Sequence, residues 1–170
     1  MSNRRIWKLL AVLALGVTPV LAQVVYTKAI VADHIRKVED GVDEFRDYLK
    51  RRGDDAKDRA ETGDSSGRTG RRGRTATEAN KEKARKTKDD LDDALGDLNR
   101  VTNRLRRKFD PTDKWIETKV QMERVMDQAR DVNQIMTRGN YGTQAERYWG
   151  VLRANINDLA RCYGLAPMGV

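Results

Sequence analysis

Residues 31–49 read VADHIRKVEDGVDEFRDYL, and apolar side chains recur in this stretch at alternating spacings of four and three. The members of this row are Val31, Ile35, Val38, Val42, Phe45 and Leu49. The spacing places all of them on one face of a helix, which we expect to occupy residues 23–52. Because a helix with a single apolar face is marginal in isolation, the row predicts that other helices cover it.

Three further segments, at about residues 76–109, 111–138 and 143–163, repeat a helical spacing of this kind. The row of the second predicted helix is Ala84, Lys88, Leu91, Leu95, Leu98, Thr102, Leu105 and Phe109. The row of the third is Trp115, Met122, Val125, Met126, Ala129, Val132 and Met136. The row of the fourth is Ala145, Tyr148 or Trp149, Leu152, Ile156, Leu159 and Tyr163. We therefore predict an all-α fold, an antiparallel four-helix bundle with heptad-patterned helices.

The ends of these helices carry local signals. Asp110 is suited to the N-cap of the third helix and Pro111 to its first position, and Gly139 is suited to its C-cap. Thr143 and Glu146 have the spacing of a capping box at the start of the fourth helix. We expect the fourth helix to end at Gly164 with Leu165 folding back, and the tail at 167–170 to be loose.

Residues 53–75, between the first and second predicted helices, have a different composition. No Val, Ile, Leu, Met or aromatic residue occurs from residue 53 to residue 77, and five glycines interrupt that run. Because such a segment has nothing to bury, we predict a long disordered loop there. Arg68, Arg71, Arg72 and Arg74 are its candidate contacts to an anionic partner, and the alternative is a solvated linker.

The first 22 residues resemble a secretory signal peptide. Arg4, Arg5 and Lys8 precede the apolar run LLAVLAL at 9–15, and cleavage is expected after Ala22. The alternative is an uncleaved membrane anchor over residues 9–26. We expect a periplasmic or secreted bacterial protein, and export would keep it away from nucleic acid.

Without residues 1–22, which hold three of the 34 basic residues and none of the 26 acidic ones, the net charge is +5. The basic excess therefore lies largely in the arginines of the predicted loop. It favours an anionic component of the cell envelope as the partner. The partner is otherwise unknown, and a homodimer is an alternative because heptad rows also serve association between chains.

Few residues carry chemistry. His34 is the only histidine and lies at the edge of the first apolar row, so we expect a half-buried structural role. A haem or metal carrier using His34 and a core methionine is the alternative. Cys162 is the only cysteine; we expect a small buried side chain, with an intermolecular disulfide as the alternative.

No catalytic pattern stands out. The acidic pairs Asp89-Asp90 and Asp92-Asp93 lie on a predicted solvent face, where nothing would raise a carboxyl pKa for acid-base work. The serines, at positions 2, 65 and 66, lie outside the predicted helices. We expect no catalytic residue, no metal site and no cofactor.

The last helix resembles the C-terminal helix of small uncharacterised exported bacterial proteins over about 20 residues. The residues that carry this resemblance are Trp149, Leu152, Arg153, Ile156, Asn157, Leu159, Ala160, Tyr163 and Leu165. The resemblance implies an exported helical protein and no particular activity. We therefore predict an exported, non-enzymatic bundle that acts by contact with a protein or an anionic surface. The alternatives are the haem or metal carrier and a self-assembling coiled-coil protein.

Overall fold

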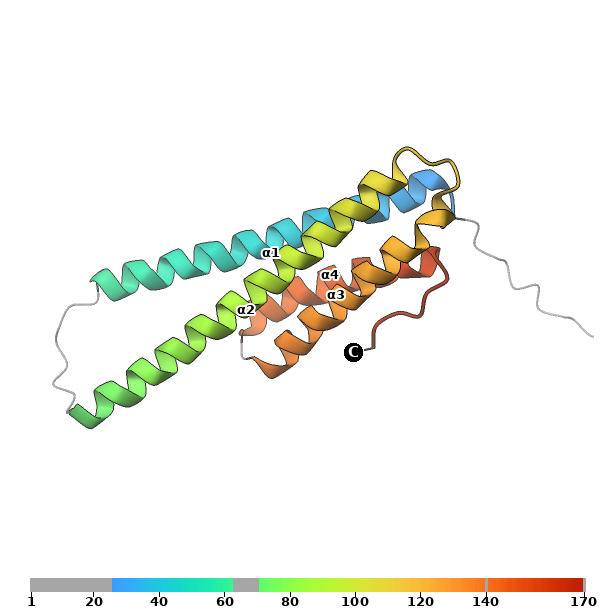
Figure 1. Cartoon of the computed structure of the whole chain (residues 1–170). Coiled ribbons are helices and arrows are strands. Elements are labelled where there is room, and N and C mark those ends of the chain that lie inside the picture. Colours follow the sequence, from blue (N-terminus) through green and yellow to red (C-terminus); the bar gives the residue numbers. More distant parts are fainter. Residues whose placement is uncertain (1–25, 63–70, 140, 170) are drawn as a thin grey trace, which may run out of the picture.

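The computed structural model describes residues 26–62, 71–139 and 141–169, and over residues 54–62, 71–85 and 87 it describes the backbone alone. Helix α1 is Lys28–Thr62 and α2 is Arg71–Phe109. A short 3-10 helix, η1 (Trp115–Thr118), leads into α3 (Lys119–Arg138), and α4 is Thr143–Cys162. The predicted all-α antiparallel four-helix bundle is confirmed (Figure 1).

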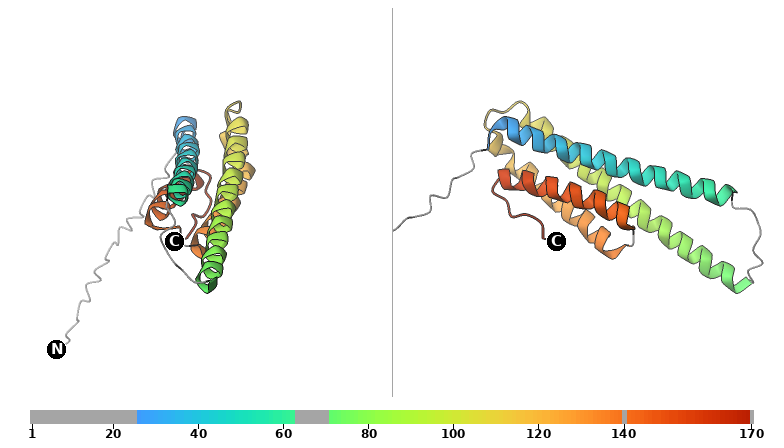
Figure 2. Two further views of the ribbon diagram at one scale, coloured as in Figure 1. Left: turned by 90° about the vertical axis from the view of Figure 1, so that its left-hand side faces the viewer. Right: turned by 180° about the vertical axis from the view of Figure 1, so that it is seen from behind.

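The four helices differ in length, and this difference shapes the molecule. Helices α1 and α2 have 35 and 39 residues, whereas α3 and α4 have 20 each. Helix α1 packs on α2 and α4, α2 also packs on α3, and the contact between α3 and α4 is much sparser. The shorter pair therefore covers only part of the α1–α2 hairpin, at the end where α1 begins and α2 finishes (Figures 1 and 2).

The predicted row on α1 forms one wall of the core. Its six members are each no more than 2% exposed. Phe45 stacks on Tyr148 of α4 with ring centroids 5.9 Å apart, and Tyr48 stacks on the same ring at 5.0 Å. The row therefore explains both why this segment is helical and which face of it contacts α4.

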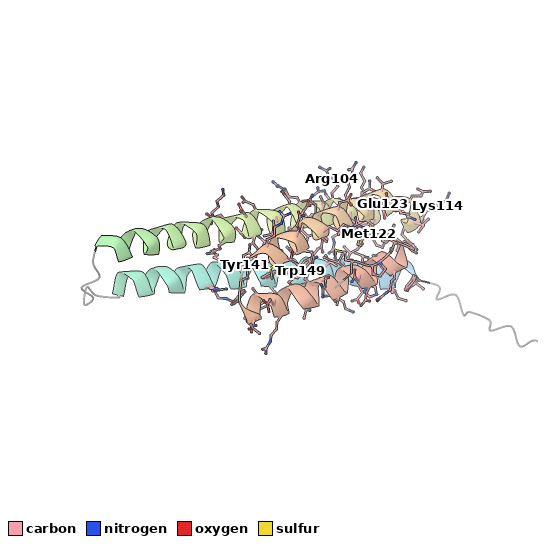
Figure 3. All side chains as sticks on the ribbon, turned by 90° about the horizontal axis from the view of Figure 1, so that it is seen from below. Arg104, Lys114, Met122, Glu123, Tyr141 and Trp149 are labelled. Carbon is pink, nitrogen blue, oxygen red and sulfur yellow. The ribbon has the colours of Figure 1, made fainter. Side chains whose placement is uncertain are left out.

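The rows of the other helices meet the first in the same core. Those of their members that are fully or almost fully buried are Leu91, Leu95, Leu98, Thr102, Leu105, Phe109, Met122, Val125, Met126, Ala129, Val132, Met136, Ala145, Trp149, Leu152, Ile156, Leu159 and Tyr163. Thr102 is satisfied there because its hydroxyl donates to the Leu98 carbonyl at 2.9 Å. Trp149 Nε1 donates to Asn133 Oδ1 at 3.0 Å and so links α4 to α3. Figure 3 labels Met122 of α3 and Trp149 of α4 among the side chains of this part of the molecule.

The start of the third helix differs from the prediction. Residues 110–114 form a turn, η1 follows, and α3 begins only at Lys119, so Asp110 is not an N-cap and Pro111 is not a first helical residue. An antiparallel connection needs several non-helical residues to reverse the chain, and a cap directly after Phe109 would leave none. A tertiary contact fixes the turn, because Lys28 Nζ donates to the Asp110 carbonyl at 2.9 Å.

The prediction of a capping box at the start of the fourth helix is also wrong. Gly142, with φ of +82°, is the N-cap, so Thr143 is already helical and makes no side-chain cap. The buried Tyr141 fixes this turn instead, since Arg52 donates to its carbonyl oxygen. The predicted helix ends are confirmed: Gly139 caps α3 through its N–H, which donates to Ile135, and Gly164 follows α4 with φ of +65°.

The predicted disordered loop is largely helical where the structure describes it. Helix α1 continues through residues 53–62, and α2 begins at Arg71, so residues 71–75 are helical as well. The prediction equated a lack of apolar residues with a lack of helix. These two segments include two Ala, four Arg, one Lys and one Glu, which favour a helix, and pairs such as Asp55 and Arg59 have the i, i+4 spacing at which opposite charges stabilise a helix. Residues 63–70 lie outside the described part of the chain.

The tail also differs from the prediction. Leu165 folds back as expected, and its N–H donates to the Ala160 carbonyl at 3.0 Å. The following residues are not loose, because Met168 is held by the side chain of Asn157 at both its N–H and its carbonyl. The predicted signal peptide, residues 1–22, lies outside the described residues, as does nearly all of the alternative anchor over 9–26.

Candidate functional site

Beyond the ends of α3 and α4, the α1–α2 hairpin projects from the bundle (Figures 1 and 2). The boundary falls near Arg52, which contacts the turn between α3 and α4 through the Tyr141 carbonyl. We call residues 54–62 and 71–87 the hairpin arm, and the remainder of the described molecule the four-helix region. The apolar rows stop at Leu49 on α1 and Leu91 on α2, so the arm has no row of large apolar residues to bury.

The two sides of the hairpin arm have opposite charge. Residues 54–62 contain four acidic and two basic residues, a net charge of −2. Residues 71–87 contain seven basic and two acidic residues, a net charge of +5. The antiparallel arrangement sets an acidic segment of α1 opposite a basic segment of α2, and such complementarity favours their association.

The contact between Gly53 and Lys88 sets the register at the base of the arm. The Lys88 ammonium lies where a side chain on Gly53 would begin. Counting outward from this contact in antiparallel register brings Thr62 to about the level of residue 79. The first two turns of α2 therefore extend past the end of α1, and the acidic segment does not reach them.

Those outer turns contain most of the predicted contact residues. Arg71, Arg72 and Arg74 lie in the first turns of α2, whereas Arg68 lies outside the described residues. No acidic residue occupies the first turn of α2. The N-terminus of a helix carries a partial positive charge, and three arginines there add to it. The first turns of α2 therefore combine three arginines with no acidic residue.

Within the four-helix region, charged residues pair across α1 and α2. Arg46 Nε lies 3.2 Å from Asp92 Oδ1, and Arg106 pairs with Glu39. The Glu39 side chain is only 13% exposed, and burial raises its pKa despite the Arg106 contact. Asn99 Nδ2 donates to Asp43 Oδ1 at 3.0 Å along the same edge. These contacts bring opposite charges together at the interface between α1 and α2.

The candidate haem or metal ligands are not brought together. His34 is half-buried on α1, as expected, while Met122, Met126 and Met136 are core residues of α3, on which α1 does not pack to any extent. The described residues include no group of three or more His, Cys, Asp or Glu side chains placed to hold a metal ion. Two surface depressions between α1 and α2 are lined mainly by charged residues, and neither includes His34 or a methionine.

Cys162 is buried, as predicted, with 5% of its surface exposed. Its thiol lies 3.4 Å from the Asp158 carbonyl, and burial raises its pKa. A buried thiol with a raised pKa forms little thiolate, and thiolate is the species that attacks disulfides. The acidic pairs on α2 lie mostly at the surface, as expected, with Asp92 engaged by Arg46.

Sequence reasoning missed two features of the surface. The first is the acidic side of the hairpin arm, which an inspection of charge along residues 54–62 would have found. The second is Asn157, whose contact with Met168 depends on how the chain folds back and leaves no local sequence signal.

Comparisons of the chain with models of protein families, with curated proteins and with solved structures gave no match. No described helix combines the length and the apolar character required to cross a bilayer.

Proposed function

We propose that this is an exported, non-enzymatic contact protein whose four-helix region holds a basic hairpin end against an anionic surface of the cell envelope. The observation that carries the proposal is the projection of α1 and α2 beyond α3 and α4, with α2 reaching furthest (Figure 1). In this arrangement the start of α2, with Arg71, Arg72 and Arg74, lies beyond the ends of α3 and α4.

The chemistry of the arm supports an anionic partner. Arginine stays charged at any physiological pH, and its planar guanidinium matches phosphate and carboxylate groups in two-point hydrogen bonds. The acidic segment of α1 lies opposite the inner part of the basic segment, and the outer turns of α2 extend past it. A partner with many negative groups would therefore meet the end of the arm first.

The four-helix region supports a scaffolding role. Its apolar rows are buried within a single chain, so the heptads do not in themselves require a second copy. The large apolar side chains exposed in the described residues are Ile30, Ile116, Val120 and Val151, on α1, η1, α3 and α4 respectively. Stability without a partner leaves the arm available for contact.

A charge-matched pair of variants tests the proposal. In the end variant, Arg68, Arg71, Arg72 and Arg74 are replaced by Gln. In the matched control, four exposed basic residues of the four-helix region are replaced by Gln: Arg104, Arg107, Lys108 and Arg124. Both variants lose four positive charges, and glutamine is compatible with a helix. Binding is measured by co-sedimentation with vesicles of phosphatidylglycerol and phosphatidylcholine, at low and high salt.

Each basic side chain at an anionic membrane surface contributes about 1 kcal/mol. The end variant should therefore bind roughly 100- to 1000-fold more weakly than the unaltered protein, while the matched control retains most of its binding. Added salt should weaken binding of the unaltered protein. Equal losses in both variants would show that net charge alone matters. No loss in the end variant, or equal binding to vesicles of phosphatidylcholine alone, would also reject the proposal.

A further inference from the structure

The C-terminal tail, residues 165–169, lies folded back along α4, where the Asn157 side chain makes two hydrogen bonds with it. The Met168 N–H donates to Asn157 Oδ1 at 2.8 Å, and Asn157 Nδ2 donates to the Met168 carbonyl at 3.2 Å. Asn157 and Met168 are 11 residues apart, so this is a contact between the helix and the returning chain. The left view in Figure 2 shows the tail on the side of the bundle between α4 and α3.

This pair of hydrogen bonds recognises a peptide backbone. An asparagine amide presents one acceptor and donors side by side, which match the N–H and carbonyl of a single residue in an extended chain. The match does not involve that residue's side chain. Asn157 would therefore accept the main chain of any extended segment that reached the same position, as in other modes of peptide recognition through the main chain.

Apolar anchors accompany the main-chain contact. Leu165 and Met168 are both half-buried and pack against the core, whereas Ala166 and Pro167 between them are exposed. Methionine adapts to irregular apolar surfaces, so the second anchor point suits more than one side chain. The site therefore accommodates a segment with two apolar residues spaced three apart.

The tail is preorganised for this site. Proline fixes its own φ near −65° and restricts the residue before it to extended conformations. Pro167 thus holds Ala166 extended and lacks an N–H that would need a partner. A segment already extended loses less conformational entropy on binding.

The surroundings of the site favour exchange of the tail. The contact between α3 and α4, on whose side the tail lies, is the sparsest between neighbouring helices of the bundle. Helix α4 ends at Cys162 and Gly164 has a left-handed backbone, so the tail can leave without unwinding the helix. No other polar contact within the described residues holds the tail beyond Leu165.

We propose that the surface of α4 around Asn157 is a binding site for an extended peptide segment of a partner protein. The segment carries two apolar residues three apart, like Leu165 and Met168. In the free protein the tail occupies the site as a tethered competitor, and the partner's segment displaces it. This inference is independent of the anionic contact at the hairpin arm.

The test uses a protein that ends at Gly164 and a fluorescent peptide with the sequence of residues 165–170, LAPMGV. Peptide binding is measured by fluorescence anisotropy with the shortened and full-length proteins. The shortened protein should bind at least about tenfold more tightly, because a tethered tail competes at a millimolar effective concentration. Thermal melting of the shortened protein shows whether the bundle is intact.

Two substitutions in the shortened protein identify the site. Asn157→Ala, which favours the helix, should weaken peptide binding at least about tenfold through the loss of two hydrogen bonds. Asn155→Ala is the matched control, since Asn155 Nδ2 is directed to the Lys37 carbonyl of α1 at 3.5 Å, and it should bind like its parent. Equal peptide binding by the shortened and full-length proteins would overturn the proposal. Equal binding by the Asn157→Ala variant and its parent would do the same.

Discussion

Helices α1 and α2 run through both the four-helix region and the hairpin arm, yet different interactions hold the two regions. In the four-helix region, α1 buries its apolar row, which runs from Val31 to Leu49, against α2 and α4. In the arm, the same helix continues through nine residues, 54–62, with no large apolar residue, beside a basic segment of α2. Helix α1 thus passes from a segment stabilised by tertiary packing to one stabilised by local propensity and charge.

This difference assigns different tasks to the two regions. Burial of apolar surface is the dominant favourable term in folding, so the four-helix region should account for nearly all of the stability. Interactions between exposed charges contribute little and are screened by salt. The arm is therefore free to vary in sequence and to contact other molecules without a large effect on folding.

The largest change in the free energy of unfolding is expected from a substitution that disrupts the packing of the four-helix region. Phe45 is fully buried and stacks on Tyr148. Phe45→Ala should lower the free energy of unfolding by about 3–5 kcal/mol because it leaves a cavity. Lys57→Ala, twelve residues further along the same helix, should change it by less than about 0.5 kcal/mol. Urea denaturation measures both, and comparable losses would contradict the division into two regions.

A smaller change in the free energy of unfolding is expected when a glycine of the four-helix region is replaced by alanine. Its sign depends on whether the added methyl group meets another side chain. An added methyl group at Gly96 meets nothing within 4 Å, so Gly96→Ala should raise the free energy of unfolding by about 0.5–1 kcal/mol. At Gly41 the same methyl group would lie 3.2 Å from Leu152 Cδ1 at the α1–α4 contact. Gly41→Ala should therefore stabilise less than Gly96→Ala or destabilise the protein. Equal stabilisation in urea denaturation would show that α4 packs more loosely than described.

The smallest effect concerns a charge that the four-helix region buries. Burial raises the pKa of Glu39 from its ordinary value of 4.5, so the folded protein holds its proton to higher pH than the unfolded chain does. The stabilisation from Glu39 is present below pH 4.5 and is lost as the pH rises through the raised pKa. Urea denaturation of the unaltered protein and of Glu39→Gln, at about pH 4 and about pH 7, isolates this contribution.

The unaltered protein should be more stable relative to Glu39→Gln at the lower pH. If the difference in the free energy of unfolding between the two proteins stayed constant with pH, burial of Glu39 would have no effect on its pKa.

The sequence predicted the core well because the spacing of apolar residues along each helix determines which face is buried. The members of the first row, Val31 to Leu49, occupy the face that contacts α2 and α4, and the rows containing Leu98, Met126 and Ile156 behave alike. Helical spacing is a local property, and each row needs only some apolar partner. The chain therefore specified its helices and their inner faces without information about their neighbours.

The wrong predictions concern positions whose conformation depends on contacts with residues far away in the sequence. Asp110 and Thr143 both fit local capping patterns, but Lys28 and Arg52 hold the turns beside them in other conformations. Residues 54–62 and 71–75 of the arm were predicted to be disordered because composition was weighed above helix propensity, whereas residues 76–87 were predicted to be helical. Asn157 was noticed as part of a helical motif, while its contact with Met168 depends on the path of the tail.

Hydrogen exchange along α1 and α2, followed by mass spectrometry, tests the central claim most directly. If tertiary packing holds the four-helix region and local interactions hold the arm, amides of residues 31–49 and 91–109 should be protected to nearly the global stability. Amides of residues 54–62 and 71–86 should exchange through local opening that requires far less free energy. Uniform protection along the whole of α1 would contradict the account, because it would show that the arm shares the stability of the four-helix region.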